Sequence, residues 1–426
     1  MMGIVRLRPE PVSDAGQRAW ELADDLARAW EPAAGARDRA GVFDPAEVTA
    51  VQRSGLAGCC VPAELGGLGV DRLQDLMAVV HRLAEADGSL ALVVHMHVSG
   101  TWSLSRARRA RLTGGDGRSD VDPDAGGLTT LLRDVAGGTT WLCAAVTEAG
   151  TNFFHPRTTL TPDAGGWVLD GTKVFATGSP AATHFSANAR VDGGALDGQL
   201  AQVIVPATTT GVHVADDWDG LGMRASGSGV VRFGQVALGP ATIVLPGGPY
   251  GRFTTGSLCG RAFGNVGNVT AMAGLAATAR HLARRRASTG RRVDDAPLGA
   301  RATVRQALGE LEADAVLLLA AVERLGRSAD AMADRMLDAP ATVDEADAGG
   351  FMAEFQASKL QINRLAVAVV DRALALAGGS GYAGTDPLAR LVRDVRAGQF
   401  MQPFSPHEAL GFLGSVAAGI DPDPLA

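Results

Sequence analysis

The side chains that could carry out chemistry are few in this chain, and their spacing argues against several familiar active sites. Four cysteines stand at positions 59, 60, 143 and 259, and no C-x-x-C pair or cysteine–histidine cluster indicates a metal site. No G-x-S-x-G motif is present, so a serine hydrolase of that type is not indicated. The glycine-rich runs GGLGV and GGSGYAG neither follow a strand pattern nor open a helix as a nucleotide-binding loop requires.

Two polar segments remain as candidates. One is RDVRAGQFMQPFSPHE, residues 393–408, where a basic, helix-compatible stretch runs to Gln402 directly before Pro403. The other is VVHMH, which places His95 and His97 within a helical pattern. A histidine can exchange a proton near neutral pH, whereas the amide of a glutamine is not a usable general base. The chemistry therefore depends on what surrounds these segments.

Composition narrows the class of protein. The chain has 426 residues, a formal charge of −7 and 46% apolar residues, which predicts two or three structural units with a large core. The acidic balance, without a long basic tract, argues against nucleic acid as a partner. The first residues lack the apolar core of a signal peptide, and no run of roughly 18 apolar residues predicts a membrane span. We expect a cytoplasmic protein with reduced thiols.

The elements that must position these segments change in character twice along the chain. Apolar residues recur at helical spacing from about 12 to 112, and a polar, glycine-rich connection follows at 113–127. Alternating, β-branched runs begin near Trp141, and the helical period returns at Ser257. Asp170-Gly171 within GGWVLDGTKVFATG predicts a hairpin turn.

This order predicts an α+β protein in three parts. They are an N-terminal helical domain at 1–139, a middle β domain at 140–246 and a C-terminal helical bundle at 247–426. Many alanines and few aromatic residues in the last part suit close packing between helices.

Seven segments resemble the acyl-CoA dehydrogenase superfamily of flavoproteins, and they come in the family's order. They are SGLAGCCVPAELGGLGVD, AEADGSLALVVHMH, AAVTEAG, GGWVLDGTKVFATG, DWDGLGMRASGSGVVRFGQVALGP, ARRRASTGRR and ALAGGSGYAGTDPLARLVRDVRAG. The resemblance covers almost the whole chain. It implies that the middle domain is a β-barrel or sandwich, that the last domain is a four-helix bundle, and that a flavin, usually FAD, lies between them.

The resemblance also implies residues that hold the flavin ring. Thr147 in VTEAG resembles the threonine that meets the pyrimidine edge, and Phe175 in KVFATG stands where the family packs an aromatic side chain on the ring. Thr177 stands where a hydroxyl or a backbone amide reaches N5, and donors there stabilise a reduced flavin. Without the resemblance, all three are ordinary residues of strands. One departure is the family's TEPGAGSD loop, which is here TEAGTNFFHPRT, with Thr151 as the stand-in for its serine.

Three further residues are expected to act across a subunit interface. Arg286 in RRASTG resembles the arginine that meets the flavin pyrophosphate of a neighbouring subunit. Gly378 and Gly379 resemble glycines that let the backbone approach the ADP part. A homodimer or homotetramer is therefore implied. The alternative for all three is structural: a solvated helix end for the arginine and a helix stop for the glycines.

Family dehydrogenases use a glutamate to remove a substrate α-proton, and this chain lacks it at both usual positions. Alignment on Arg393 and Asp394 places Gln402 at the first position. The second position precedes an arginine that corresponds to Arg261, our expected substrate-site residue, and it is Gly260 here. The nearby His407-Glu408 pair is the alternative source of a base, if the prolines redirect the chain; otherwise it only begins the next helix.

The missing base leaves three functions. The first is that of the two-component flavin-dependent monooxygenases of the same superfamily, among them sulfur-heterocycle hydroxylases, phenol hydroxylases and amino-sugar N-oxygenases. These act through a flavin hydroperoxide and receive reduced flavin, FMN or FAD, from a separate reductase. In that branch His97, or else His95, corresponds to a histidine near the reactive edge of the flavin; the alternative is a histidine packed within its helix.

The second function is dehydrogenation of an acyl thioester, on coenzyme A or a carrier, with a relocated base and an electron-transfer flavoprotein as acceptor. The third is use of the fold without redox chemistry. FFHPRT and the connection at 113–127 are expected to shape specificity for a small organic or thioester-bound substrate.

Overall fold

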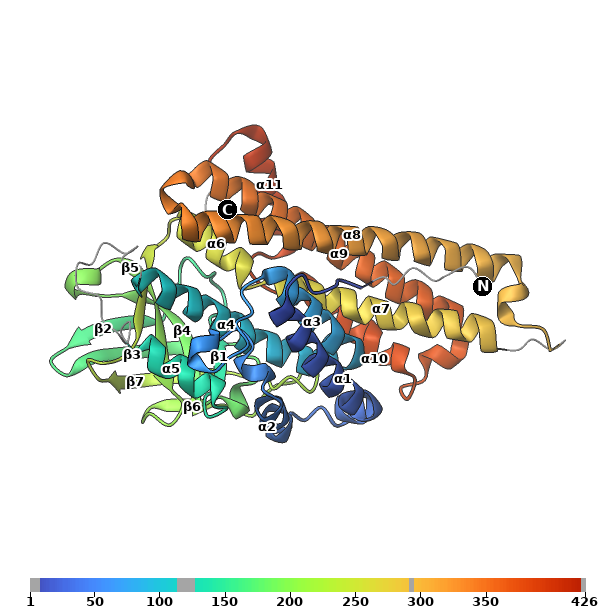
Figure 1. Cartoon of the computed structure of the whole chain (residues 1–426), viewed down its shortest axis with the longest axis horizontal. Coiled ribbons are helices and arrows are strands. Elements are labelled where there is room, and N and C mark those ends of the chain that lie inside the picture. Colours follow the sequence, from blue (N-terminus) through green and yellow to red (C-terminus); the bar gives the residue numbers. More distant parts are fainter. Residues whose placement is uncertain (1–7, 113–126, 291–294, 423–426) are drawn as a thin grey trace.

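The order of helices, sheet and helix bundle is confirmed in the computed structural model, which describes residues 8–112, 127–290 and 295–422. The sheet lies at one end of the molecule, and the long helices of the bundle extend away from it (Figure 1). The α+β class is therefore confirmed, while the exact boundaries at 139/140 and 246/247 stay predictions. The predicted connection at 113–127 falls, apart from Gly127, outside the described residues.

The N-terminal part consists of helices that pack on one another and on the bundle. They are α1 (Asp14–Ala40), α2 (Pro45–Ser54), α3 (Leu73–Ala86), α4 (Gly88–Leu112) and α5 (Leu128–Ala136). The start of α1 is fixed by Ser13, whose hydroxyl accepts from Gly16 N and donates to the buried Asp75 of α3 at 2.5 Å. This N-cap ties the first helix to the third.

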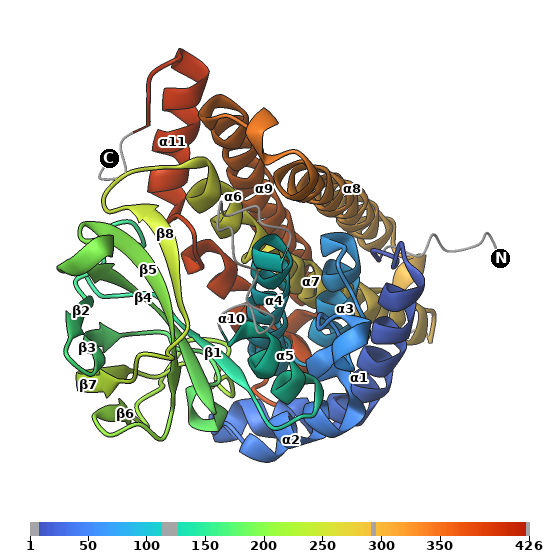
Figure 2. The same cartoon turned by 60° about the vertical axis from the view of Figure 1, so that its left-hand side comes forward.

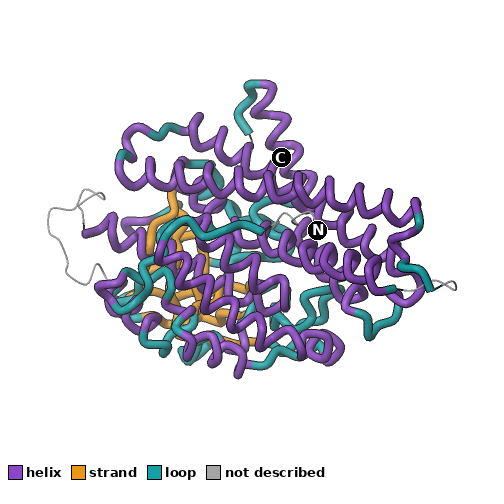
Figure 3. The backbone as a smooth tube through the Cα atoms, turned by 45° about the vertical axis from the view of Figure 1, so that its right-hand side comes forward, coloured by secondary structure: helices purple, strands orange, loops and turns teal. Residues whose placement is uncertain are grey.

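The middle part is one mixed sheet of eight strands in the order β6-β7-β3-β2-β4-β5-β8, with β1 alongside β4. The strands are β1 (Leu142–Ala145), β2 (Thr159–Asp163), β3 (Gly166–Lys173), β4 (His184–Val191), β5 (Gln199–Pro206), β6 (Val212–Val214), β7 (Val231–Leu238) and β8 (Val244–Pro249). Both β1 and β2 pair with β4 in parallel, and the other neighbours are antiparallel. Figure 3 shows these strands gathered in one region among the helices.

The predicted hairpin turn at Asp170-Gly171 is wrong. Both residues lie inside β3, and the turn that joins β2 to β3 is Ala164-Gly165, between the paired Asp163 and Gly166. Gly171 instead marks a shift in the pairing of β3 with β7. Its φ of 154° and the close approach of Thr158, 2.7 Å from a built Cβ to Cα, explain why glycine stands there.

The C-terminal part contains three long helices, two of them longer than thirty residues. Its helices are α6 (Thr255–Phe263), α7 (Val266–Thr289), α8 (Ala302–Asp338), α9 (Glu345–Ala377), α10 (Pro387–Asp394) and α11 (Pro406–Ala418). α7, α8 and α9 pack on one another, and α3 and α4 pack on α7. Figure 2 shows α4 between the sheet and the bundle, and this helix packs on β1 as well as on α7.

We predict that Gly171→Ala lowers the free energy of unfolding by about 1–3 kcal/mol, because the new methyl group collides with Thr158 and the backbone angle disfavours alanine. Thermal unfolding of the purified protein measures the effect. Gly309→Ala is the matched control: this glycine is exposed within α8, a built Cβ meets nothing within 4 Å, and alanine there should stabilise by up to about 1 kcal/mol. Equal effects of both substitutions would contradict the packing of Gly171.

Candidate active site

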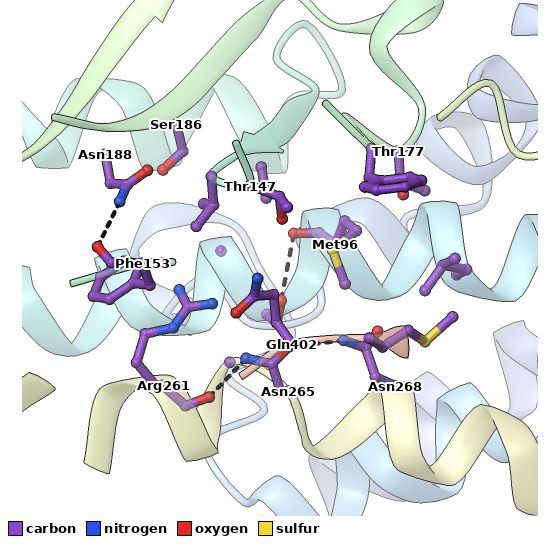
Figure 4. A pocket seen from close by; sticks show the side chains of 18 of the residues that line it. Met96, Thr147, Phe153, Thr177, Ser186, Asn188, Arg261, Asn265, Asn268 and Gln402 are labelled. Carbon is purple, nitrogen blue, oxygen red and sulfur yellow. Dashed lines mark hydrogen bonds between the residues drawn. The ribbon is translucent and has the colours of Figure 1, made fainter. Parts of the chain in front are cut away.

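A cavity of about 830 Å³ lies where the three parts of the chain meet. Its walls come from β1, β4, β5, the loops around Thr147 and Trp218, one face of α4, the α6–α7 junction and residues 393–402. Figure 4 shows Ser186, Asn188 and Thr147 on the sheet side, Arg261, Asn265 and Asn268 on the opposite side, and Gln402 between them. Far-apart segments of the sequence therefore form one site.

One face of α4 lines the cavity, and neither candidate histidine lies on that face. The lining residues of this helix are Leu92, Met96, Ser99, Gly100 and Ser103, which recur at helical spacing. His95 and His97 flank Met96 and therefore point to either side of that face. His95 packs so closely on α7 that a Cβ at Gly267 would collide with its ring.

His97 joins three elements from outside the cavity. Its Nε2 lies 3.1 Å from the carbonyl oxygen of Ala57, and its Nδ1 accepts from Leu142 N at 2.9 Å. The ring is stacked on Trp141 with centroids 4.0 Å apart. Burial lowers the pKa of His97 to about 4, so the ring is neutral at pH 7. The geometry favours a positioning role for His97 over direct contact with a cofactor.

The three residues expected at a flavin ring all line the cavity: Thr147, Phe175 and Thr177. Phe175 has a φ of 56° and is 61% exposed, with its ring edge-on to Trp218 at 6.0 Å. The hydroxyl of Thr177 lies 3.0 Å from that of Ser228. An exposed apolar ring beside buried hydroxyl groups suits a flat, polar-edged ring system, so the residues present fit a flavin at this end of the cavity.

The residues expected at the ADP part lie elsewhere in the described chain. Arg286, near the end of α7, forms an ion pair with Asp386, which also caps α10. Gly378 ends α9 with a φ of 63°, and neither it nor Gly379 lines the cavity. Gly381 of the same loop approaches Arg286, so these residues form one cluster at the end of the bundle. Their contact with a neighbouring subunit stays a prediction.

A buried ion pair holds the sheet side of the cavity in place. Lys173 is fully buried, and its Nζ donates to Glu148 Oε1 at 2.6 Å and to the carbonyl and side-chain oxygens of Asn188 at 2.6 and 2.9 Å. Asn188 in turn donates to Phe153 O at 3.2 Å. Burial lowers the pKa of Lys173 to about 8, and Lys173 lowers the pKa of Glu148 against the opposing effect of burial. The network connects the Thr147 loop to β3 and β4.

The opposite side carries polar groups without partners inside the protein. Gln402 Oε1, Asn268 Oδ1 and Arg261 Nε are buried and make no hydrogen bond in the described structure. The guanidinium of Arg261 lies over the ring of Phe153 at 4.1 Å, and burial lowers its pKa to about 10, so it stays charged at pH 7. Buried polar atoms normally have partners, so these atoms are arranged to meet a bound molecule.

Lys359 of α9 fixes the segment that carries Gln402. It is 3% exposed, and its Nζ donates to the carbonyl oxygens of Met401 and of Phe404, the latter at 2.5 Å. Burial lowers the pKa of this amine to about 8. The two carbonyl groups flank Gln402-Pro403, so this side chain determines where the glutamine stands.

The residues expected to replace the missing glutamate base and the missing loop serine do not line the cavity. Glu408 accepts from Ser405 N at 2.6 Å in a capping box at the start of α11, and neither it nor His407 lines the cavity. The recruitment of this pair as a base is therefore not supported. Thr151 donates to His155 O at 2.5 Å and does not line the cavity either.

Sequence reasoning missed Asn265 and Asn268, which line the cavity with Arg261. The side-chain amide of Asn268 donates to Asn265 Oδ1 at 2.8 Å, and that of Asn265 donates to Arg261 O at 2.7 Å. The signal was the spacing of these three polar residues, four and then three apart, in an otherwise apolar stretch. Met96 and Lys359 carried no comparable signal.

We predict that Lys359→Met destabilises the protein by about 1–3 kcal/mol, because the carbonyl groups of Met401 and Phe404 lose their buried donor. Urea unfolding measures the loss. Lys359→Arg, which keeps a charged donor, should retain more of the stability. Lys359→Met with wild-type stability would show that these carbonyl groups find other partners.

Acid should remove the contribution of His97 to stability. Its folded pKa of about 4 lies below the unfolded value of 6.5, so the contribution is fully present above pH 6.5 and is lost as the pH falls through about 4. The full loss is about 3 kcal/mol. The readout is the difference in unfolding free energy between wild type and His97→Gln at pH 7 and pH 4.5, since other groups titrate in both proteins. A difference that does not change with pH would contradict a neutral buried His97.

Three family models match the chain in succession. They are the N-terminal domain of acyl-CoA dehydrogenase at residues 20–107, the middle domain at 143–236 and the C-terminal domain at 262–402. Butyryl-CoA dehydrogenase from Megasphaera elsdenii shares the fold, with a TM-score of 0.77, 20% identity and 96% of this chain covered along with 99% of that chain.

Relatives with greater identity include nitrososynthases. L-evernosamine nitrososynthase from Micromonospora sp. is 36% identical over 97% of this chain and 93% of its own length. Amino sugar nitrososynthase DnmZ from Streptomyces peucetius is 33% identical over 96% of this chain and 95% of its own length. A structure of KijD3 with FMN and dTDP-3-amino-2,3,6-trideoxy-4-keto-3-methyl-D-glucose has a TM-score of 0.86 and 34% identity, covering 97% of this chain and 96% of that chain. The chain belongs to the acyl-CoA dehydrogenase family and is a flavin-dependent oxidoreductase.

Proposed function

We propose that this protein is a monooxygenase that oxidises the amino group of a nucleotide-linked amino sugar at nitrogen. The observation that carries the proposal is Gln402, a neutral amide in the middle of the cavity at the position where family dehydrogenases keep a glutamate. Asp219 is the one carboxylate among the described residues that line the cavity, and it is exposed. The full-length similarity to nitrososynthases supports an amine as the group that is oxidised.

The lining of the cavity includes polar groups that a sugar nucleotide can meet. In the described structure, the side-chain oxygens of Gln402 and Asn268 are free acceptors for a polar ligand, while Ser186 and Gln202 hydrogen-bond to each other. KijD3 binds a nucleotide-linked amino sugar together with FMN.

FMN is the flavin that we propose, in place of the FAD expected from the wider family. Thr147, Phe175 and Thr177 would hold its ring, as the resemblance implied. Arg286, the residue expected at the pyrophosphate of FAD, is already paired with Asp386. When bound in its reduced form, the flavin supplies the two electrons that activate O2. The residues of this chain orient the amine, exclude water and keep the cavity free of a buried carboxylate base.

The proposed reaction needs a reductant from outside the chain. An amine, O2 and one reduced flavin give a hydroxylamine, water and oxidised flavin. The hydroxylamine, a second O2 and a second reduced flavin give the nitroso compound, two molecules of water and oxidised flavin. A separate flavin reductase is therefore the proposed partner. In the described part of the chain, every helix is too short or too polar to span a lipid bilayer.

Dehydrogenation of an acyl thioester is the alternative, and the cavity gives it less support. It requires a carboxylate or another base within hydrogen-bond reach of the substrate α-carbon. Gln402 cannot supply it, and Glu408 is used as a helix cap. Use of the fold without redox chemistry has no specific observation in its favour.

We expect the purified protein to add oxygen from 18O2 to dTDP-3-amino-2,3,6-trideoxy-4-keto-3-methyl-D-glucose when FMN, NADH and a flavin reductase are present. Mass spectrometry of the nucleotide sugar measures the incorporation. FAD in place of FMN should support less product. The control substrate is dTDP-glucose, which has no amine and should stay unchanged.

Two results would overturn the proposal. One is NADH and O2 consumption without labelled sugar, although the sugar binds. The other is anaerobic bleaching of enzyme-bound oxidised flavin by an acyl-CoA, which would establish the dehydrogenase reaction instead.

A further inference from the structure

The inner part of the cavity has an unusual charge balance for a site that accepts an amine. Among its described lining residues, the charged side chains are Arg261, Arg393, Arg396 and Asp219. Arg393 is paired with Asp38 and Arg396 with Asp371, so both are neutralised at the edge of the site. Asp219 is exposed, while Arg261 has no acidic partner in the described chain.

The groups behind the walls do not reverse this balance. Lys359 lies behind Gln402 and donates to two backbone carbonyl groups, and the nearby carboxylate of Glu408 offsets part of its positive charge. Asp394 is buried behind Met223, and burial raises its pKa to about 6, so it is mostly ionised at pH 7; Arg390 lies 3.8 Å away and offsets its charge. Lys173 and Glu148 form an ion pair under the sheet side. His95 and His97 are neutral, because burial lowers the pKa of each to about 4.

Among the described residues that line the cavity, an ammonium group would meet the cation of Arg261 and no buried carboxylate. A positive charge within a few ångströms lowers the pKa of a neighbouring ammonium, by about 1 to 3 for close pairs. Gln402 Oε1 is buried without a donor, and Figure 4 shows its side chain projecting between Arg261 and Asn268. A neutral amine supplies an N–H donor to this oxygen without bringing a charge into the cavity.

Oxidation at nitrogen requires the lone pair of the amine, which the ammonium form has given to a proton. On the basis of the proposed function, we propose that this cavity binds the amine of its substrate in the unprotonated form. Arg261 disfavours the ammonium, and the carbonyl of Gln402 accepts an amine N–H and orients the lone pair. Arg261 and Gln402 are thus specificity-determining residues that select a protonation state. A glutamate at position 402 would favour the ammonium and oppose the reaction.

The test is a count of protons released on binding, without turnover. The full chain with oxidised FMN and no reductant is titrated calorimetrically with dTDP-3-amino-2,3,6-trideoxy-4-keto-3-methyl-D-glucose, below the pKa of the free sugar amine. Two buffers of different ionisation enthalpy give the number of protons. We expect about one proton released per sugar bound, and none with dTDP-glucose, which lacks the amine.

Variants test the roles of Arg261 and Gln402 separately. Arg261→Gln should reduce the release to less than about half a proton, and Arg261→Lys should restore most of it, because only the charge matters for this effect. Gln402→Met should weaken binding of the amino sugar by about tenfold and that of dTDP-glucose by less. Arg324→Gln, an exposed arginine of α8, is the matched control for loss of a positive charge and should behave as wild type.

The outcomes distinguish the inference from the proposed function. Tight binding of the amino sugar by wild type without proton release overturns the inference and leaves the proposed function standing. Proton release that is unchanged in Arg261→Gln overturns the role of Arg261. If neither nucleotide sugar binds to the wild-type protein, the proposed function fails, and the inference fails with it.

Discussion

The ion pair between Lys173 and Glu148 is the interaction on which the sheet side of the site depends. Its members come from β3 and from the loop after β1, and Asn188 of β4 completes the network. A charged pair in a fully buried place is costly to desolvate, and it persists only when hydrogen bonds satisfy its remaining atoms. Glu148 meets this requirement by also accepting from the backbone amides of Arg157 and Thr158. Four segments of the sheet domain are thereby held in one arrangement.

The helical side is held differently. Lys359 reaches across from α9 to two backbone carbonyl groups, and the α6–α7 junction presents Arg261, Asn265 and Asn268 through a chain of amide hydrogen bonds. Neither side needs a ligand to be ordered, because each has its own internal network. The free polar atoms remain between the two sides, where a ligand can satisfy them. Such preorganisation lowers the entropy that a bound substrate must lose.

Much of this arrangement follows from the sequence, and the exceptions have physical causes. The order of the three parts, the cavity positions of Thr147, Phe175, Thr177 and Arg261, and the central place of Gln402 were all predictable from family segments. The direction of the α4 histidines was not, since the first half of that helix is buried nearly all round and has no polar stripe to indicate its phase. The prediction of a hairpin turn failed because a glycine after aspartate can also lie inside a strand where another segment leaves no room for a side chain. Thr158 approaches Gly171 in this way.

The support of Gln402 by Lys359 has a consequence for how this scaffold can change. Lys359 binds only main-chain atoms around position 402, so it fixes the place of the side chain without specifying its type. Glutamine and glutamate codons differ in one nucleotide. A single mutation can therefore bring a carboxylate to the centre of the cavity or remove it without removing the main-chain contacts of Lys359. In evolution, proteins of this fold can therefore gain or lose a negative charge at this position by a point mutation. Selection can act on that charge separately from the shape of the cavity.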